Sequence, residues 1–165
     1  MIAKFRKFYA CSILERWVFL QSLFLLILTK FFLAFLGFKK THQILFYLCP
    51  KKLLLNKTIT TKTELEKSQS IARMVEIAGH LLPLTVKCLP LSLVTWLVLH
   101  RHGIPADFRI GVPRSVEDFE AHAWVEVRGH RLRQRADQEN RFIPFPKPFV
   151  PTQNSPQHER NCRHL

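Results

Sequence analysis

The sequence has only four cysteines, and no two of them form a CxxC pair. They are spread along the chain at Cys11, Cys49, Cys88 and Cys162. This spacing argues against a zinc site and against a disulfide framework, so a reduced cytosolic chain is the simplest interpretation. We expect Cys11 and Cys49, which stand among apolar residues, to be inert core thiols. Neither a metal nor a cofactor is expected.

Acidic residues are also scarce. Twelve Asp and Glu stand against 25 Lys and Arg, which gives a formal charge of +13. Residues 1–60 carry ten basic residues and a single acid, Glu15, whereas residues 61–145 carry twelve basic residues against ten acidic ones. A positive balance favours anionic partners. The sequence contains no nucleic-acid-binding motif, so we do not expect nucleic acid among them.

The apolar run Trp17–Phe38 has no small-residue cleavage site after it, which argues against a signal peptide. The run is long enough to span a bilayer, but Lys30 lies inside it, at an insertion cost of about 2.5–3.5 kcal/mol. Three interpretations stay open: a helix packed on its own domain or a partner, attachment to a membrane surface, and a spanning helix. We expect a cytoplasmic location, with membrane association left open.

Helical periodicity dominates the first hundred residues. Gly37 is predicted to end the first helix, and a short second helix is predicted over 41–49, before a proline. Apolar spacing predicts a third helix over 64–80 and a fourth over 87–100. Gly103 is the expected C-cap of the fourth helix.

The period then changes from helical to alternating. The segments DFRIGV at 107–112 and AHAWVEVRG at 121–129 are predicted to be strands. The segment HRLRQRA, at 130–136, extends the predicted sheet after a turn at Arg128-Gly129. From Pro146 onward the chain is polar and proline-rich, and we expect it to be disordered.

A cysteine at the start of an apolar helix has a chemical use that alanine lacks. The free N–H groups and the dipole of a helix N-terminus favour a thiolate, and the same groups can bind an oxyanion. A nearby imidazole can hold the proton and return it to a leaving amine. Cys88 and His122 fit these roles, and the alternative is an inert buried thiol with a structural histidine.

Four motifs together resemble the B proteins of lasso peptide biosynthesis, which belong to the transglutaminase-like cysteine protease superfamily. They are CLPLSL at 88–93, RHGIPA at 101–106, RIGV at 109–112 and AHAWVEV at 121–127. The similarity extends over about residues 5–145. It implies an α+β fold with a transglutaminase/papain-like core, in which the cysteine lies at a helix N-terminus packed on a small antiparallel sheet.

The resemblance also implies an organisation of the chain. Residues 1–60 form apolar, basic N-terminal helices, residues 61–145 form the catalytic core, and residues 146–165 form the disordered tail. Some similar proteins carry a fused winged-helix recognition domain, and at this length we expect the chain to lack one. The expected partners are therefore a lasso precursor peptide, a separate recognition protein and an ATP-dependent, asparagine-synthetase-like cyclase.

The implied activity is that of a leader peptidase, a hydrolase in which Cys88 is the nucleophile and His122 the general base and acid. The third catalytic group in similar proteins is an aspartate after the histidine strand, and Asp137 is the only aspartate in that region. Gln134 lies nearer the expected position, and an amide can also orient an imidazole. Two other functions stay open: acyl transfer by the same fold, and a non-enzymatic membrane-associated module.

Three further residues of the matched motifs have structural interpretations. We expect Ser92 to be a small packing residue, although it could also bond the backbone of the site. Trp124 is expected in the core. We expect Glu126, on the same strand face as His122 and Trp124, to be a solvated charge rather than a catalytic acid.

Overall fold

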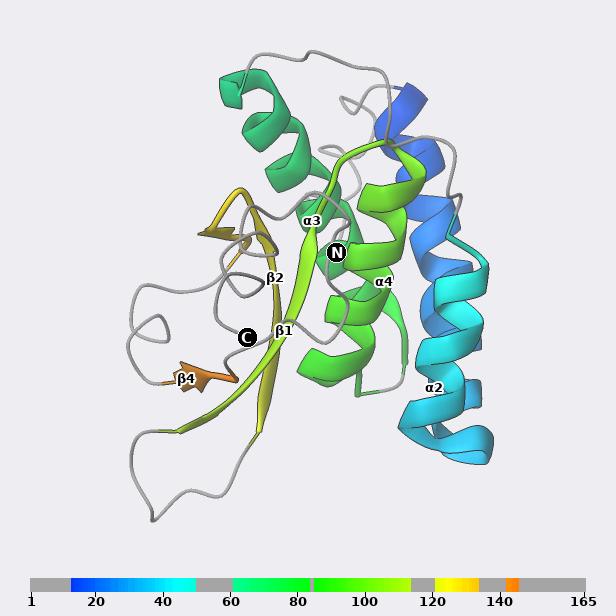
Figure 1. Ribbon diagram of the computed structural model, residues 1–165. Coiled ribbons are helices and arrows are strands. Elements are labelled where there is room, and N and C mark those ends of the chain that lie inside the picture. Colours follow the sequence, from blue (N-terminus) through cyan, green and yellow to red (C-terminus); the bar gives the residue numbers. More distant parts are fainter. Residues whose placement is uncertain (1–12, 50–60, 84, 114–120, 134–141, 146–165) are drawn as a thin grey trace, which may run out of the picture.

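The computed structural model describes residues 13–49, 61–83, 85–113, 121–133 and 142–145. Within these ranges the chain forms three helices and one antiparallel sheet. The elements are α2 (Ile13–Tyr47), α3 (Thr61–Leu81), α4 (Cys88–Arg101), β1 (Asp107–Pro113), β2 (His122–Val127), β3 (His130–Arg131) and β4 (Phe142–Pro144). The helices α3 and α4 lie between the sheet and α2 (Figure 1). The predicted mixture of helices and a small antiparallel sheet is confirmed.

The first helix changes direction at Gly37, whose backbone φ of 72° and ψ of 174° are not helical. This combination of φ and ψ is adopted essentially only by glycine, and the break predicted at this residue is confirmed. The second helical segment then continues to Tyr47. By length and composition α2 is able to cross a membrane, a test that the core helix of a soluble protein and an N-terminal signal sequence also pass.

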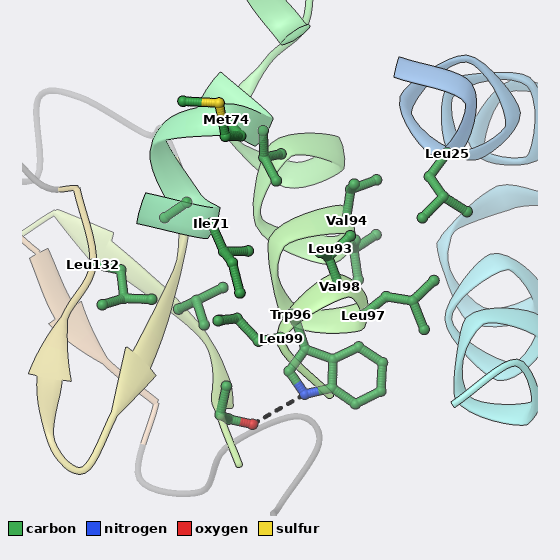
Figure 2. Packing of buried hydrophobic residues seen from close by; sticks show 14 of the residues in the cluster. Leu25, Ile71, Met74, Leu93, Val94, Trp96, Leu97, Val98, Leu99 and Leu132 are labelled. Atoms are coloured by element: carbon green, nitrogen blue, oxygen red, sulfur yellow. Dashed lines mark hydrogen bonds between the residues drawn. The ribbon is translucent and has the colours of Figure 1, made fainter. Parts of the chain in front are cut away.

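The predicted third and fourth helices correspond to α3 and α4, with ends shifted by one to three residues. Most of α4 is buried, including Trp96, whose Nε1 donates a hydrogen bond to the Ala106 carbonyl at 3.1 Å. Figure 2 shows Leu25 of α2 on one side of α4, and Ile71 of α3 on the other. A helix that is apolar on all sides belongs in the core, and α4 is the element on which the others pack.

The sheet has the strand order β3-β2-β1-β4, with every neighbouring pair antiparallel. The turn predicted between β2 and β3 is present, and both Arg128 (φ 52°) and Gly129 (φ 80°) have the positive φ that a type I′ turn requires. In the described part of 130–136, only His130–Arg131 is strand. The strand β4 was not predicted.

The N-terminal helix shares one hydrophobic core with the rest of the described chain. Its buried residues Leu25, Leu26 and Leu45 belong to the same cluster as Val75 of α3 and Leu97 of α4. The division of the chain at residue 60 stays a prediction. Cys11, Cys162 and the tail predicted from Pro146 onward lie outside the described residues.

His100, near the end of α4, is a buried titratable group. Burial lowers its pKa, although Nδ1 donates a hydrogen bond to the Trp96 carbonyl at 3.0 Å. The unfolded chain therefore binds a proton more readily than the folded one. The contribution of the neutral imidazole to stability is complete above about pH 6.5, the pKa of histidine in the unfolded chain. This contribution is lost as the pH falls below that value.

We predict that the urea concentration at the midpoint of unfolding decreases when the pH is lowered from about 7.5 to about 5.5. We expect this decrease to be smaller in His100→Gln. Part of the fall should remain, because burial also lowers the pKa of His42 and His102. The matched control is His80→Gln, since this histidine side chain is 79% exposed. An unchanged pH dependence in His100→Gln would contradict the assignment.

Candidate active site

Cys88 is the first residue of α4, as predicted. The residue before it, Lys87, is extended (φ −77°, ψ 175°) and makes no side-chain capping bond. The first N–H groups of a helix have no partner within it, so they remain available to a group at this end. Cys88 is half-buried and, like Cys49, is not in a disulfide.

His122 is the first residue of β2 and lies opposite Gly111 of β1. Two aromatic rings lie nearly parallel to its imidazole. The Phe142 ring has its centroid 4.8 Å away at 25°, and the Trp124 ring has its centroid 6.1 Å away at 20°. The half-buried imidazole therefore has a defined surface on which to stack.

Cys88 and His122 line the same pocket, which has a volume of about 140 Å³. The sequence separates them by more than thirty residues, and the packing of α4 on the sheet brings them together. Most of the other lining residues are apolar or carry a small hydroxyl, among them Ala72, Leu91, Ser92, Thr95, Val125 and Leu132. The pocket thus offers a mostly apolar space beside the thiol.

Gly111 of β1, which lies opposite His122, permits the close approach of β4 on the other side of β1. A Cβ atom at this position would lie 2.5 Å from the Ile143 carbonyl oxygen and 2.8 Å from Cη2 of Trp124. Real Cβ atoms do not come so close, so any other residue would displace β4 or the indole. Because β4 carries Phe142, this glycine indirectly sets the ring stack on His122.

Ser92 has a larger role than the expected packing. It is buried, and its Oγ donates a hydrogen bond to the Ala123 carbonyl at 2.9 Å. Of the two interpretations left open by the sequence, the less favoured one, a bond to the backbone of the site, is confirmed. The bond joins α4, one turn after Cys88, to the residue that follows His122.

Glu126 is not the solvated charge that the sequence led us to expect. Its side chain is only 13% exposed and lies beside Arg109 (3.2 Å) and Arg131 (3.6 Å). It also accepts a hydrogen bond of 2.7 Å from Nε1 of Trp124, while Arg131 lies 4.4 Å above the indole ring. Trp124 itself is buried, as predicted. The two arginines fix the Glu126 carboxylate within the sheet, and the carboxylate in turn holds the indole ring beside the imidazole.

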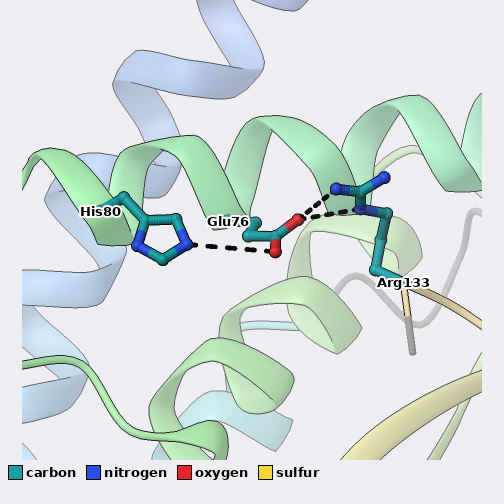
Figure 3. A network of polar contacts seen from close by, with 3 residues as sticks. All are labelled: Glu76, His80 and Arg133. Carbon is teal, nitrogen blue, oxygen red and sulfur yellow. Dashed lines mark hydrogen bonds and ion pairs between the residues drawn. The ribbon is translucent and has the colours of Figure 1, made fainter. Parts of the chain in front are cut away.

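A second ion pair lies at the edge of the pocket, where Glu76 of α3 meets Arg133. The Nε and Nη2 atoms of Arg133 donate to Glu76 Oε2 at 2.8 and 2.6 Å, and His80 Nε2 lies 4.0 Å from the other oxygen (Figure 3). Both members of the pair line the pocket. Arg133 and Arg128 are the described non-glycine residues with positive φ, and each pairs with a glutamate of α3. No signal in the sequence points to either pair.

The third predicted catalytic group lies outside the described residues. Both Asp137 and its rival Gln134 fall within 134–141. The choice between them stays a prediction.

We predict that Ser92→Ala lowers the stability by about 1 kcal/mol, because the buried Ala123 carbonyl loses a donor from another element. The control is Ser68→Ala, which removes a buried hydroxyl that bonds within its own helix, to the Glu64 carbonyl at 2.6 Å. Urea unfolding of both variants gives the comparison. Equal midpoints for Ser92→Ala and Ser68→Ala would mean that the bond between α4 and β2 adds no more stability than a bond within one helix.

Comparison with protein families matches residues 32–146, from the middle of α2 to just beyond β4, to the transglutaminase-like superfamily. Neither a curated protein nor a solved structure matches the chain. Members of this superfamily are generally enzymes, often cysteine peptidases or acyltransferases. With most of its length matched, the chain belongs to the transglutaminase-like superfamily.

Proposed function

We propose that this protein is a cysteine peptidase that removes the leader from a ribosomally made lasso precursor peptide. The observation that carries the proposal is that Cys88, at the start of α4, and His122, at the start of β2, line one pocket. Superfamily membership supports thioester chemistry in general. The four motifs shared with lasso B proteins support the substrate class.

In the proposed reaction, His122 takes the proton of the Cys88 thiol and the sulfur attacks the carbonyl at the end of the leader. The free N–H groups at the start of α4 are suited to stabilise the resulting oxyanion. The C–N bond then breaks while His122 returns the proton to the leaving amine, which becomes the N-terminus of the core peptide. The leader remains as a thioester on Cys88.

Water completes the reaction. His122 removes a proton from the water molecule as it attacks the thioester, and the proton passes to the departing thiol, so the leader leaves with a free carboxylate. A second amine in place of water would give acyl transfer through the same thioester. The resemblance to the lasso B proteins favours hydrolysis.

The proposal includes two protein partners. A separate winged-helix recognition protein would present the leader, and an ATP-dependent, asparagine-synthetase-like cyclase would close the ring on the freed amine. The location proposed is cytoplasmic. Reconstitution with these partners and the precursor is therefore the proper assay.

We predict that Cys88→Ala abolishes leader cleavage and leaves the fold intact, because the alanine cannot form a thioester. Mass spectrometry of the precursor, incubated with the variant and the recognition protein, measures the loss. The matched control is Cys49→Ala, which removes a half-buried thiol whose pKa is raised by burial and which does not line the pocket. Full cleavage by Cys88→Ala would exclude this cysteine as the nucleophile.

We also predict that Asp137→Ala slows cleavage by more than tenfold, a loss of about 1.4 kcal/mol or more in transition-state stabilisation. The reason is that an imidazole that becomes charged needs an acceptor on its second nitrogen. Gln134→Ala should have a milder effect. The reverse order of severity, measured as kcat/KM on one precursor, would make the amide the orienting group.

A further inference from the structure

The outer face of α2 carries a continuous row of exposed apolar side chains. Its seven members recur every three or four residues, and each is between 48% and 74% exposed. We call this row the outer stripe; it comprises Ile13, Trp17, Leu20, Phe24, Ile27, Phe31 and Phe35. At 1.5 Å per residue it is about 33 Å long. An exposed apolar surface of this extent marks an interaction site.

The polarity of α2 is the reverse of that of a helix on a water-exposed surface. Every exposed residue from Ile13 to Leu36 is apolar. The polar groups turn toward the protein instead: Lys30 donates to the Thr85 carbonyl at 2.8 Å, and Glu15 accepts from Ser70 Oγ at 2.8 Å. The exposed face of α2 is therefore suited to an apolar surrounding and not to water.

A lipid surface matches the stripe better than a protein does. Protein interfaces surround their apolar centre with a polar rim, whereas the exposed face of α2 has no polar residue between Ile13 and Leu36. Four of the seven stripe residues are aromatic, as is typical of helices at a membrane interface. Exposed Lys39 and Lys40 follow the stripe directly, and residues 1–60 carry ten basic residues against one acid. This charge favours anionic headgroups.

On a lipid surface, the packing of α2 would require the helix to lie along the plane of the membrane. Its inner face is committed to α3 and α4 through Leu25 and Leu26, which are 4% and 1% exposed. Spanning would surround that face with lipid and separate the helix from its own core. An in-plane helix buries only its outer face, to a depth of about 5–10 Å. In Figure 1 the sheet lies on the opposite side of α3 and α4 from α2, so His122 on β2 stays away from the lipid.

We propose that the outer stripe of α2 docks the protein on the surface of an anionic membrane, with the helix lying in the plane of the interface. The test is flotation of the full chain with vesicles of phosphatidylcholine, with and without phosphatidylglycerol. We expect binding that requires phosphatidylglycerol and weakens with salt. The double variant Phe24→Gln/Phe31→Gln should bind about tenfold less or weaker still. The matched control, Ile77→Gln/Leu81→Gln, changes two exposed apolar residues of α3 and should bind as the wild type does.

Trp17 gives a measurement on the wild-type protein itself. It is 68% exposed, whereas Trp96 and Trp124 are buried. Brominated phospholipids should therefore quench the fluorescence of the wild type, and Trp17→Phe should lose most of the quenching while still floating. Absence of flotation, equal binding by the stripe variant, or a soluble dimer formed through the stripe would overturn the proposal. Resistance to extraction at alkaline pH would also overturn it, because that is the behaviour of a spanning helix.

Discussion

The packing of α4 on β2 is the constraint on which the site depends. A buried hydrogen bond from Ser92 to the Ala123 carbonyl joins the two elements one turn beyond Cys88 and one residue beyond His122. A shift of α4 by a single turn would move the thiol by about 5 Å and change its place in the pocket that it shares with His122. The burial of α4 on all sides prevents such a shift, because α2 and α3 occupy its other faces. The proposed chemistry thus depends on a core helix rather than on a loop.

The sheet supplies the second half of the site through a layered arrangement behind the imidazole. Trp124 lies beside the His122 ring and is held by Glu126, which in turn is neutralised by Arg109 and Arg131. A partly buried carboxylate is costly unless it is paired and hydrogen-bonded, and here it has both kinds of partner. Gly111 leaves the space that this arrangement needs. A rigid support of this kind limits the orientations open to His122.

Local signals in the sequence predicted a large part of this. The break at Gly37, the turn at Arg128-Gly129 and the position of Cys88 at a helix start each depend on a few neighbouring residues, and each is confirmed. The expectation of a solvated Glu126 was wrong, the backbone bond of Ser92 was only the less favoured alternative, and β4 and the Glu76–Arg133 pair were missed. These features arise from contacts between distant segments, and no short-range pattern encodes such contacts. The papain-like character of the core and the third catalytic group stay predictions.

The proposed pairing of Cys88 with His122 can be measured through the rate at which the thiol is alkylated. Iodoacetamide reacts with thiolates, so mass spectrometry of the labelled chain gives a separate rate for each cysteine. We expect Cys88 to react faster than Cys49, whose thiol pKa is raised by burial. We expect His122→Ala to slow the labelling of Cys88 and to leave that of Cys49 unchanged. If Cys88 reacts no faster than Cys49, or reacts equally fast without the imidazole, the two residues are not a catalytic pair.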